Sequence, residues 1–103
     1  LKMKKHSTQK AFAIMKERRG KDTIILFHNG DNFEAYEKDA QIIARELGLG
    51  IAVREDMMTA IFPQEKQEEY SNLLLDKGYA VCISEMRDIF GNYITDIAIE
   101  EDE

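Results

Sequence analysis

The sequence has a single cysteine, no long apolar run and no phosphate-binding loop, and each absence excludes a class of protein. Cys82 is the single cysteine, so a disulfide framework is excluded and a reducing cytoplasm is the expected compartment. No apolar stretch approaches the length of a membrane span, and no signal peptide is visible, so no membrane partner is expected. No Gly-x-x-x-x-Gly-Lys-Ser/Thr loop is present to cradle the phosphates of a nucleotide.

What is present fits one soluble globular domain. The 103 residues suffice for a modest core, and a 44% share of hydrophobic residues is ordinary for such a domain. The first residue is Leu, which suggests a piece of a longer product. We expect a basic leader at residues 1–6, one domain over residues 7–99 and a disordered acidic tail at residues 100–103.

Charge is unevenly distributed along the chain. The net charge is −6, yet residues 1–21 carry eight Lys or Arg against Glu17 alone, which gives +7 and leaves −13 for the remainder. One interpretation is a solvated basic helix beside an acidic body. The other is a phosphate-facing patch. Its members would be Lys2, Lys4, Lys5, Lys10, Lys16, Arg18, Arg19 and Lys21.

A β-hairpin is the central prediction. Apolar and β-branched residues fill residues 23–28, the turn cluster Asn29-Gly30-Asp31 follows, and residues 32–36 form the returning strand. The spacing of apolar residues predicts a first helix that begins at Ser7-Thr8. Gly20, Gly48 and Gly78 are each expected to end one of three helices. The other expected helices cover residues 37–47 and 64–77, and the other strands cover residues 51–54, 59–62, 79–84 and 92–99.

Two of these elements carry further expectations about burial. The strand at residues 79–84 is nearly continuous in apolar residues, which predicts a buried strand that holds Cys82 in the core. In the helix at residues 37–47 the apolar spacing predicts a buried stripe and a solvent-facing remainder. The stripe is Ala40, Ile43, Ala44 and Leu47, and the outside is Lys38, Asp39, Gln41, Arg45 and Glu46.

These elements imply an α/β domain with a mixed β-sheet of about six strands flanked by three helices, because a hairpin pairs antiparallel while helical crossovers permit parallel pairing. The run Gly30-Asp31-Asn32-Phe33-Glu34-Ala35-Tyr36 then resembles the N-terminal mismatch-recognition domain of MutS proteins. Residues 58–63 and 69–85 agree in order and spacing, so the resemblance covers most of the chain. The resemblance implies the same α/β architecture with a mixed sheet.

One departure from the family pattern bears on function. The resemblance implies a Phe that wedges beside a mispaired base and, two positions on, a Glu that hydrogen-bonds that base. Here Asn32 stands at the wedge position and Glu34 at the acceptor position. Side chains alternate along a strand, so Phe33 is expected to project into the core and the wedge is expected to be lost.

The expected function is therefore a MutS-like DNA-binding module, related to DNA mismatch repair, that binds duplex DNA weakly alone and lacks wedge-based recognition. Its partners would include other MutS-like domains or a protein partner. The alternative is a protein-interaction module that keeps the scaffold and has lost DNA binding, as the acidic body would suit. No enzyme activity, cofactor or metal site is expected, because Asp31, Glu34 and Asp39 lack a His or a second acidic cluster beside them.

The candidate DNA-binding residues are Asn32, Glu34, Gly30, Asp31, His28 and Met58. His28 stands where the family often has Arg; it could contact a phosphate, sense pH or be an ordinary surface histidine. Met58 matches a Met in a connection that approaches DNA in the family. Here Glu55 and Asp56 would repel phosphates, and the alternative is a solvent loop at residues 55–58 with one or both Met side chains in the core.

Overall fold

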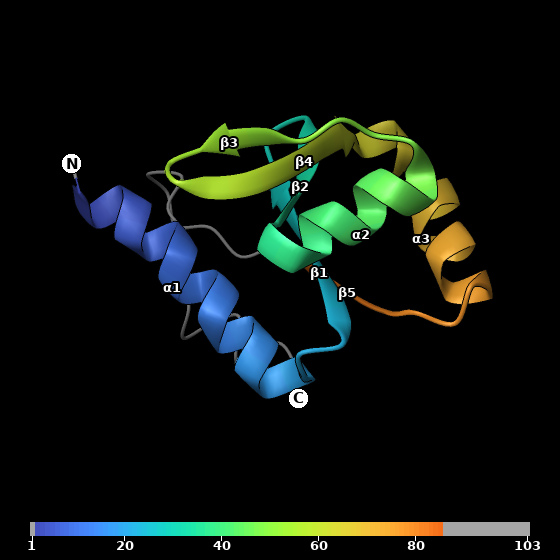
Figure 1. Cartoon of the computed structure of the whole chain (residues 1–103), viewed down its shortest axis with the longest axis horizontal. Coiled ribbons are helices and arrows are strands. Elements are labelled where there is room, and N and C mark those ends of the chain that lie inside the picture. Colours follow the sequence, from blue (N-terminus) through green and yellow to red (C-terminus); the bar gives the residue numbers. More distant parts are fainter. Residues whose placement is uncertain (1, 86–103) are drawn as a thin grey trace.

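The computed structural model describes residues 2–85, and side chains from residue 9 onward. Helices and strands alternate through this part of the chain (Figure 1). The elements are α1 (Lys2–Arg19), β1 (Thr23–Asn29), β2 (Asn32–Tyr36), α2 (Glu37–Leu47), β3 (Ala52–Arg54), β4 (Met57–Pro63), the 3₁₀ helix η1 (Gln64–Lys66), α3 (Gln67–Asp76) and β5 (Ala80–Ser84).

The strands form one mixed sheet in the order β3-β4-β2-β1-β5. Strand β1 pairs with β5 in parallel, and all other neighbours are antiparallel. The parallel pair needs the long crossover through α2, β3, β4 and α3, whereas β1 and β2 need only a tight turn. The predicted α/β fold with a mixed sheet is confirmed. Five strands are described instead of about six, because the sixth predicted strand, residues 92–99, lies outside the described residues.

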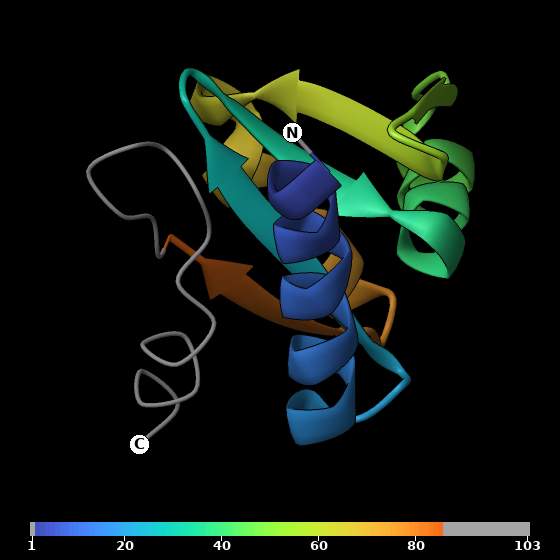
Figure 2. The same cartoon turned by 90° about the vertical axis from the view of Figure 1, so that its left-hand side faces the viewer.

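Helices cover both faces of the sheet, as Figures 1 and 2 show from two sides. We call one side the α2/α3 face, where helices α2 and α3 pack on a core that includes Leu26, Phe33 and Phe62. We call the other side the α1 face, where Met15 of α1 packs on a smaller core that includes Phe27. Alternation along each strand therefore sends neighbouring residues into two different environments.

Glycine positions mark the ends of the helices, as predicted. Gly48 ends α2 with φ 73°, and Gly20 and Gly78 also have positive φ after α1 and α3. A left-handed residue lets the chain leave a helix while the last carbonyls keep partners, and glycine adopts that conformation without a side-chain clash. In α2 the predicted apolar stripe is confirmed in its centre, since Ala40 and Ile43 are fully buried.

Three predictions about local structure were wrong. Helix α1 begins at Lys2 rather than at Ser7, so a hydroxyl cap does not start it. Strand β4 begins at Met57, so residues 55–58 are not a loop: Glu55 and Asp56 alone form a two-residue turn between Arg54 and Met57. Residues 64–66 are a 3₁₀ helix after Pro63 and precede α3, instead of being its first turn.

Strand β5 is also less buried than its apolar sequence predicted. Within the described residues it is the last strand of the sheet, paired with β1 on one side only. Ala80 is exposed, Cys82 is half-buried against the α1-face core, and Ser84 alone is fully buried. An apolar run indicates a strand, but its place in the sheet depends on pairing across the chain.

Asp39, expected on the outside of α2, is instead 1% exposed. Its carboxylate lies 2.8 Å from the Lys16 ammonium of α1 and also accepts the Ile25 N–H at 3.1 Å. That N–H needs an acceptor because β2 pairs with β1 only from Phe27 onward. Burial raises the pKa of the Asp39 carboxyl, although hydrogen bonds from Lys16 and Ile25 oppose the change. The pair connects α1, β1 and α2, and it also removes Lys16 from any phosphate-facing patch.

Candidate nucleic-acid interface

The β1–β2 hairpin carries most of the predicted site residues. Its strands pair His28 with Phe33 and Asn29 with Asn32, and Gly30-Asp31 forms the two-residue turn. Gly30 has φ 66°, a value that tight hairpin turns need and that glycine adopts readily. The hairpin predicted from the Asn-Gly signal is therefore confirmed, and its turn is exposed to solvent.

The order of faces along β2 agrees with the strand-alternation argument. Phe33 is 3% exposed and packs in the α2/α3-face core, where its ring lies 5.8 Å from that of Phe62. Asn32 and Glu34, one position to either side, therefore project to the α1 face. Asn32 is exposed, so an amide and not an aromatic ring is what this end of β2 presents.

Glu34 differs from expectation in its exposure. Its side chain shares a face with Asn32, but only 5% of the residue is exposed. Three donors hold its carboxylate: Asn29 Nδ2 at 2.7 Å and Arg54 Nη1 at 3.2 Å from Oε2, and the Tyr36 hydroxyl at 2.7 Å from Oε1. An ionised carboxylate offers about four lone-pair positions, so most of its acceptor capacity is used within the chain.

Two members of this cluster were missed by the sequence reasoning. The signal for Tyr36 was available, because residues 34 and 36 of one strand share a face. No local signal indicated Arg54, which is 20 residues from Glu34 and reaches it from β3. The Arg54 side chain is 49% exposed, so it brings a partly solvated cation to the buried carboxylate.

His28 and Met58 lie on the opposite face from Asn32 and Glu34. His28 stacks on Phe33 with ring centroids 4.4 Å apart, at the edge of the α2/α3-face core. Met58 occupies that same face farther along β4, where its sulfur accepts a hydrogen bond from Gln41 of α2 at 3.2 Å. The predicted residues thus form two groups instead of one continuous surface. Met57, the neighbour of Met58, is buried on the α1 face, as expected of one or both Met side chains.

The turn between β3 and β4 presents two carboxylates in an unusual backbone conformation. Glu55 and Asp56 have φ 53° and 65°, which is the pattern of a type I′ hairpin turn. Asn, Asp and Gly are the residues that this turn favours, so Glu55 carries backbone strain and Asp56 fits the turn better. Their charges and exposure would repel a phosphate backbone at this position.

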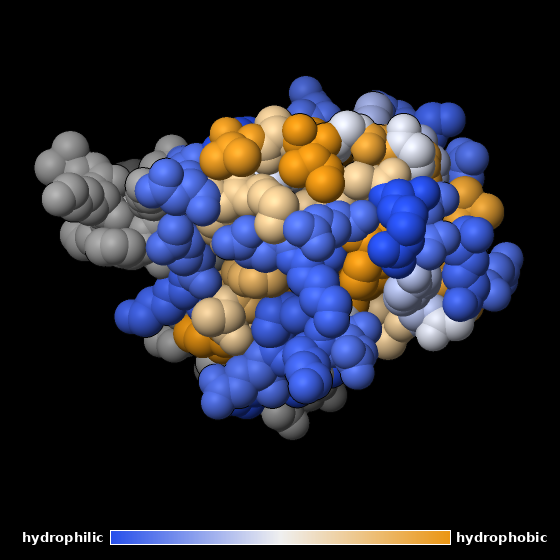
Figure 3. All heavy atoms as spheres, in the orientation of Figure 1, coloured by the Kyte–Doolittle hydropathy of each residue, from blue (hydrophilic) through white to orange (hydrophobic). Residues whose placement is uncertain are grey.

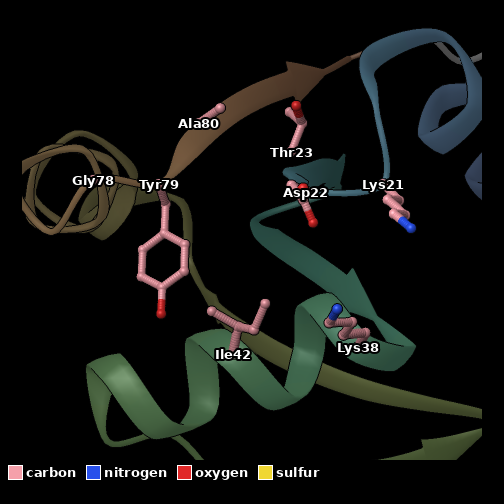
Figure 4. A pocket seen from close by; sticks show the side chains of 8 residues that line it. All are labelled: Lys21, Asp22, Thr23, Lys38, Ile42, Gly78, Tyr79 and Ala80. Carbon is pink, nitrogen blue, oxygen red and sulfur yellow. The ribbon is translucent and has the colours of Figure 1, made fainter.

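A pocket of about 450 Å³ opens at the other end of the sheet, where β1 and β5 begin (Figure 4). Tyr79 forms one wall, and its hydroxyl donates to Glu46 of α2 at 2.7 Å. Lys21, Asp22 and Lys38 also line the pocket, so two cations and one carboxylate border it (Figure 4). This pocket contains none of the predicted site residues. Within the described residues, no three His, Cys, Asp or Glu side chains gather in a way that could hold a metal ion.

Comparison with known proteins agrees with this geometry. A family model described as MutS domain I matches residues 6–90, most of the chain. The chain belongs to the MutS domain I family. Its five described strands and three helices, with the hairpin at one end, are the MutS domain I fold as this chain builds it. No helix within the described residues is long and apolar enough to cross a membrane.

Several curated relatives carry the name DNA mismatch repair protein MutS. The protein of Thermosipho melanesiensis is 34% identical over 82 residues, which cover 75% of this chain and 10% of that protein. Those of Microcystis aeruginosa and Halothermothrix orenii are each 41% identical, over 60% and 63% of this chain and 8% of theirs. The chain therefore spans about a tenth of the length of these relatives.

Proposed function

We propose that this MutS domain I binds duplex DNA in a mismatch-repair context but does not recognise mismatches by inserting an aromatic ring. The observation that carries the proposal is the face of β2: Asn32 is exposed where the wedge would stand, and Phe33 is buried on the opposite face. The names of the relatives support the repair context. The proposed role is binding, without catalysis.

A change of register would not restore the wedge. Exposing Phe33 would forfeit roughly 1.5–3 kcal/mol of hydrophobic burial. The same one-residue slip would turn Glu34 into the apolar core beside Phe62 and separate its carboxylate from three donors. Both effects favour the present register, so Asn32 remains the presented residue.

An amide can donate to and accept from base edges, but it has no ring to stack. Stacking of an aromatic side chain on a base contributes about 1–3 kcal/mol to binding, and the Asn32 amide cannot supply this stacking energy. Affinity would then depend on cations around the hairpin and on α1. The exposed cationic side chains described on α1 are Lys10, Arg18 and Arg19; Lys21 follows α1, and Arg54 is partly exposed beside Glu34.

The test is a titration of labelled duplexes, one fully paired and one with a single mismatch, at two salt concentrations. We expect weak binding, a steep decrease with salt because phosphate neutralisation drives it, and equal affinity for both duplexes. A clear preference of the unmodified chain for the mismatched duplex would refute the proposal.

Asn32→Phe is the companion variant, and Asn72→Phe is its matched control, since Asn72 is exposed on α3 away from the hairpin. If the scaffold still supports a wedge, Asn32→Phe raises the ratio of mismatched to paired affinity by up to about tenfold, equivalent to the lower part of the stacking range. Asn72→Phe should leave that ratio unchanged. Equal responses would show that added hydrophobicity, and not position, causes the change.

A protein-interaction module is the second candidate. Val53, on the outermost described strand β3, is 72% exposed, and Ile51 beside it is 45% exposed. Figure 3 shows apolar atoms gathered at this upper edge of the molecule. Exposed apolar residues on an unpaired strand edge, next to the acidic turn, suit a protein partner better than DNA. Absence of DNA binding even at low salt would favour this candidate.

A further inference from the structure

His28 has hydrogen-bond acceptors at both of its ring nitrogens. Nδ1 lies 3.1 Å from Oε1 of Glu85, just after β5, and Nε2 lies 2.9 Å from Oε1 of Gln64 in η1. A neutral imidazole carries one N–H and can donate to only one of these oxygens, whereas the imidazolium donates to both. The geometry around this side chain therefore fits the protonated form.

The other groups around the ring agree with a positive charge. Phe33 of β2 stacks on the imidazole with an interplanar angle of 10°, and a cation is attracted to an aromatic face. Glu85 supplies the negative charge, Gln64 of η1 is neutral, and the hairpin turn contributes the backbone of Gly30. Partial burial lowers the pKa of His28, but the hydrogen bonds to Glu85, Gln64 and Gly30 outweigh it, and the pKa lies above 6.5.

These contacts fasten the hairpin tip to two distant segments. Gln64 is 36 residues and Glu85 is 57 residues from His28 in the sequence. The Gln64 N–H also donates to the carbonyl of Asp31 at 2.9 Å, so η1 holds the turn through both side chain and backbone. We call His28, Gln64 and Glu85 the clamp. Its histidine packs against the ring of Phe33, the neighbour of Asn32, on the opposite face of β2 from Asn32.

We propose that protonated His28 is a positioning residue for the hairpin: the imidazolium holds the turn against η1 and the end of β5, keeps Phe33 packed inward and fixes Asn32 as the presented side chain. Loss of the proton removes one of the two donated hydrogen bonds and loosens the tip. The DNA-related part of this inference rests on the proposed function, whereas the clamp itself does not.

The first test is a pH titration of the full chain followed by NMR of the histidine ring carbons and protons. The sequence has two histidines, so His6→Gln assigns the signals. We expect His28 to titrate above 6.5, and Gln64→Met to lower its midpoint by about one pH unit, because one hydrogen bond to the charged ring is lost. Glu85→Gln should lower the midpoint as well.

Gln67→Met is the matched control for Gln64→Met. Gln67 follows η1, and its amide donates to Ser71 instead of contacting His28. This variant should leave the His28 midpoint where it is. A His28 midpoint at or below 6.5, or one that Gln64→Met and Glu85→Gln both leave unchanged, would overturn the clamp.

The second test asks whether the clamp positions Asn32. The side-chain amide signals of Asn32 should shift with the same midpoint as His28, and this coupling should weaken in Gln64→Met. DNA affinity should step down as pH rises through that midpoint while the salt dependence stays constant. A direct contact between His28 and a phosphate would instead change the slope of log K against log salt by about 0.9.

The outcomes separate the two proposals. If the His28 and Asn32 signals titrate together but no DNA is bound, the proposed function fails and the clamp stands. If DNA is bound without a pH step at the His28 midpoint, or with a changed salt slope, the positioning role fails and DNA binding stands.

Discussion

The buried pair of Asp39 and Lys16 allows the structure to be tested by a single substitution. Asp39→Ala would remove the acceptor for the Ile25 N–H and the partner of the Lys16 ammonium, which would keep the carbonyl of Thr23 and the face of the Phe12 ring. Removing one partner of a buried ion pair lowers the free energy of unfolding by about 3–5 kcal/mol. The whole free energy of unfolding of a domain is roughly 5–15 kcal/mol. Asp39→Ala should therefore lower the urea midpoint strongly.

Asp39→Asn separates the hydrogen bonds from the charge. Its amide oxygen can still accept the Ile25 N–H, and burial already disfavours the ionised form of Asp39. We expect a smaller loss of about 1–2 kcal/mol, mainly from the amide nitrogen facing Lys16. Glu69→Gln is the control, because it breaks an exposed pair with Lys66 and should change stability by at most about 0.5 kcal/mol.

The direction of the pKa shift of Asp39 predicts how the free energy of unfolding changes with pH. Because the folded-state pKa of Asp39 lies above its ordinary value of 3.8, the folded protein binds this proton more tightly than the unfolded chain. That contribution to stability is fully present below 3.8 and is lost as pH rises through the folded-state pKa. Urea unfolding of the unmodified chain and Asp39→Asn across this range should show the unmodified chain gaining relative stability on acidification. Equal losses for the Ala and Asn variants, or a relative gain at higher pH, would refute the reasoning.

Three further predictions concern the turn, the Glu34 cluster and His28. Glu55→Asn should stabilise the protein by roughly 0.5–1 kcal/mol in urea unfolding, because Asn tolerates the φ of 53° better, whereas Glu55→Gln should not. Tyr36→Phe should cost about 1–3 kcal/mol by leaving the buried Glu34 carboxylate one donor short, and a loss no greater than that of Tyr70→Phe would contradict this. His28→Gln should lose the stability that protonated His28 contributes below 6.5, so its difference from the unmodified chain should shrink as pH rises through the folded-state pKa; a constant thermal-shift difference would disagree.

The presented residues of the hairpin could be predicted because they depend on local rules. Alternation along a strand places Phe33 opposite to Asn32, and the Asn-Gly pair locates the turn, so the sequence alone sufficed for both. The same alternation rule assigns each candidate DNA-binding residue to one face of the sheet. Once the pairing register of β1 and β2 is known, the rule places His28 and Asn32 on opposite faces. The helix ends at Gly20, Gly48 and Gly78 could be predicted for the same reason, because they depend on the conformation of a single residue.

The burial of charged and polar side chains, and their hydrogen-bond partners, depend on segments that are far apart in the sequence and meet only in the fold. The sequence determined the strand, the turn, the helix stops and the inward direction of Phe33. Only the tertiary structure decided that Asp39 lies buried on Lys16, that Arg54 reaches Glu34 and that Gln64 and Glu85 enclose His28. The physical reason is range: periodicity and turn chemistry act over a few residues, whereas desolvation and hydrogen bonding of a charged side chain depend on every element that packs against it.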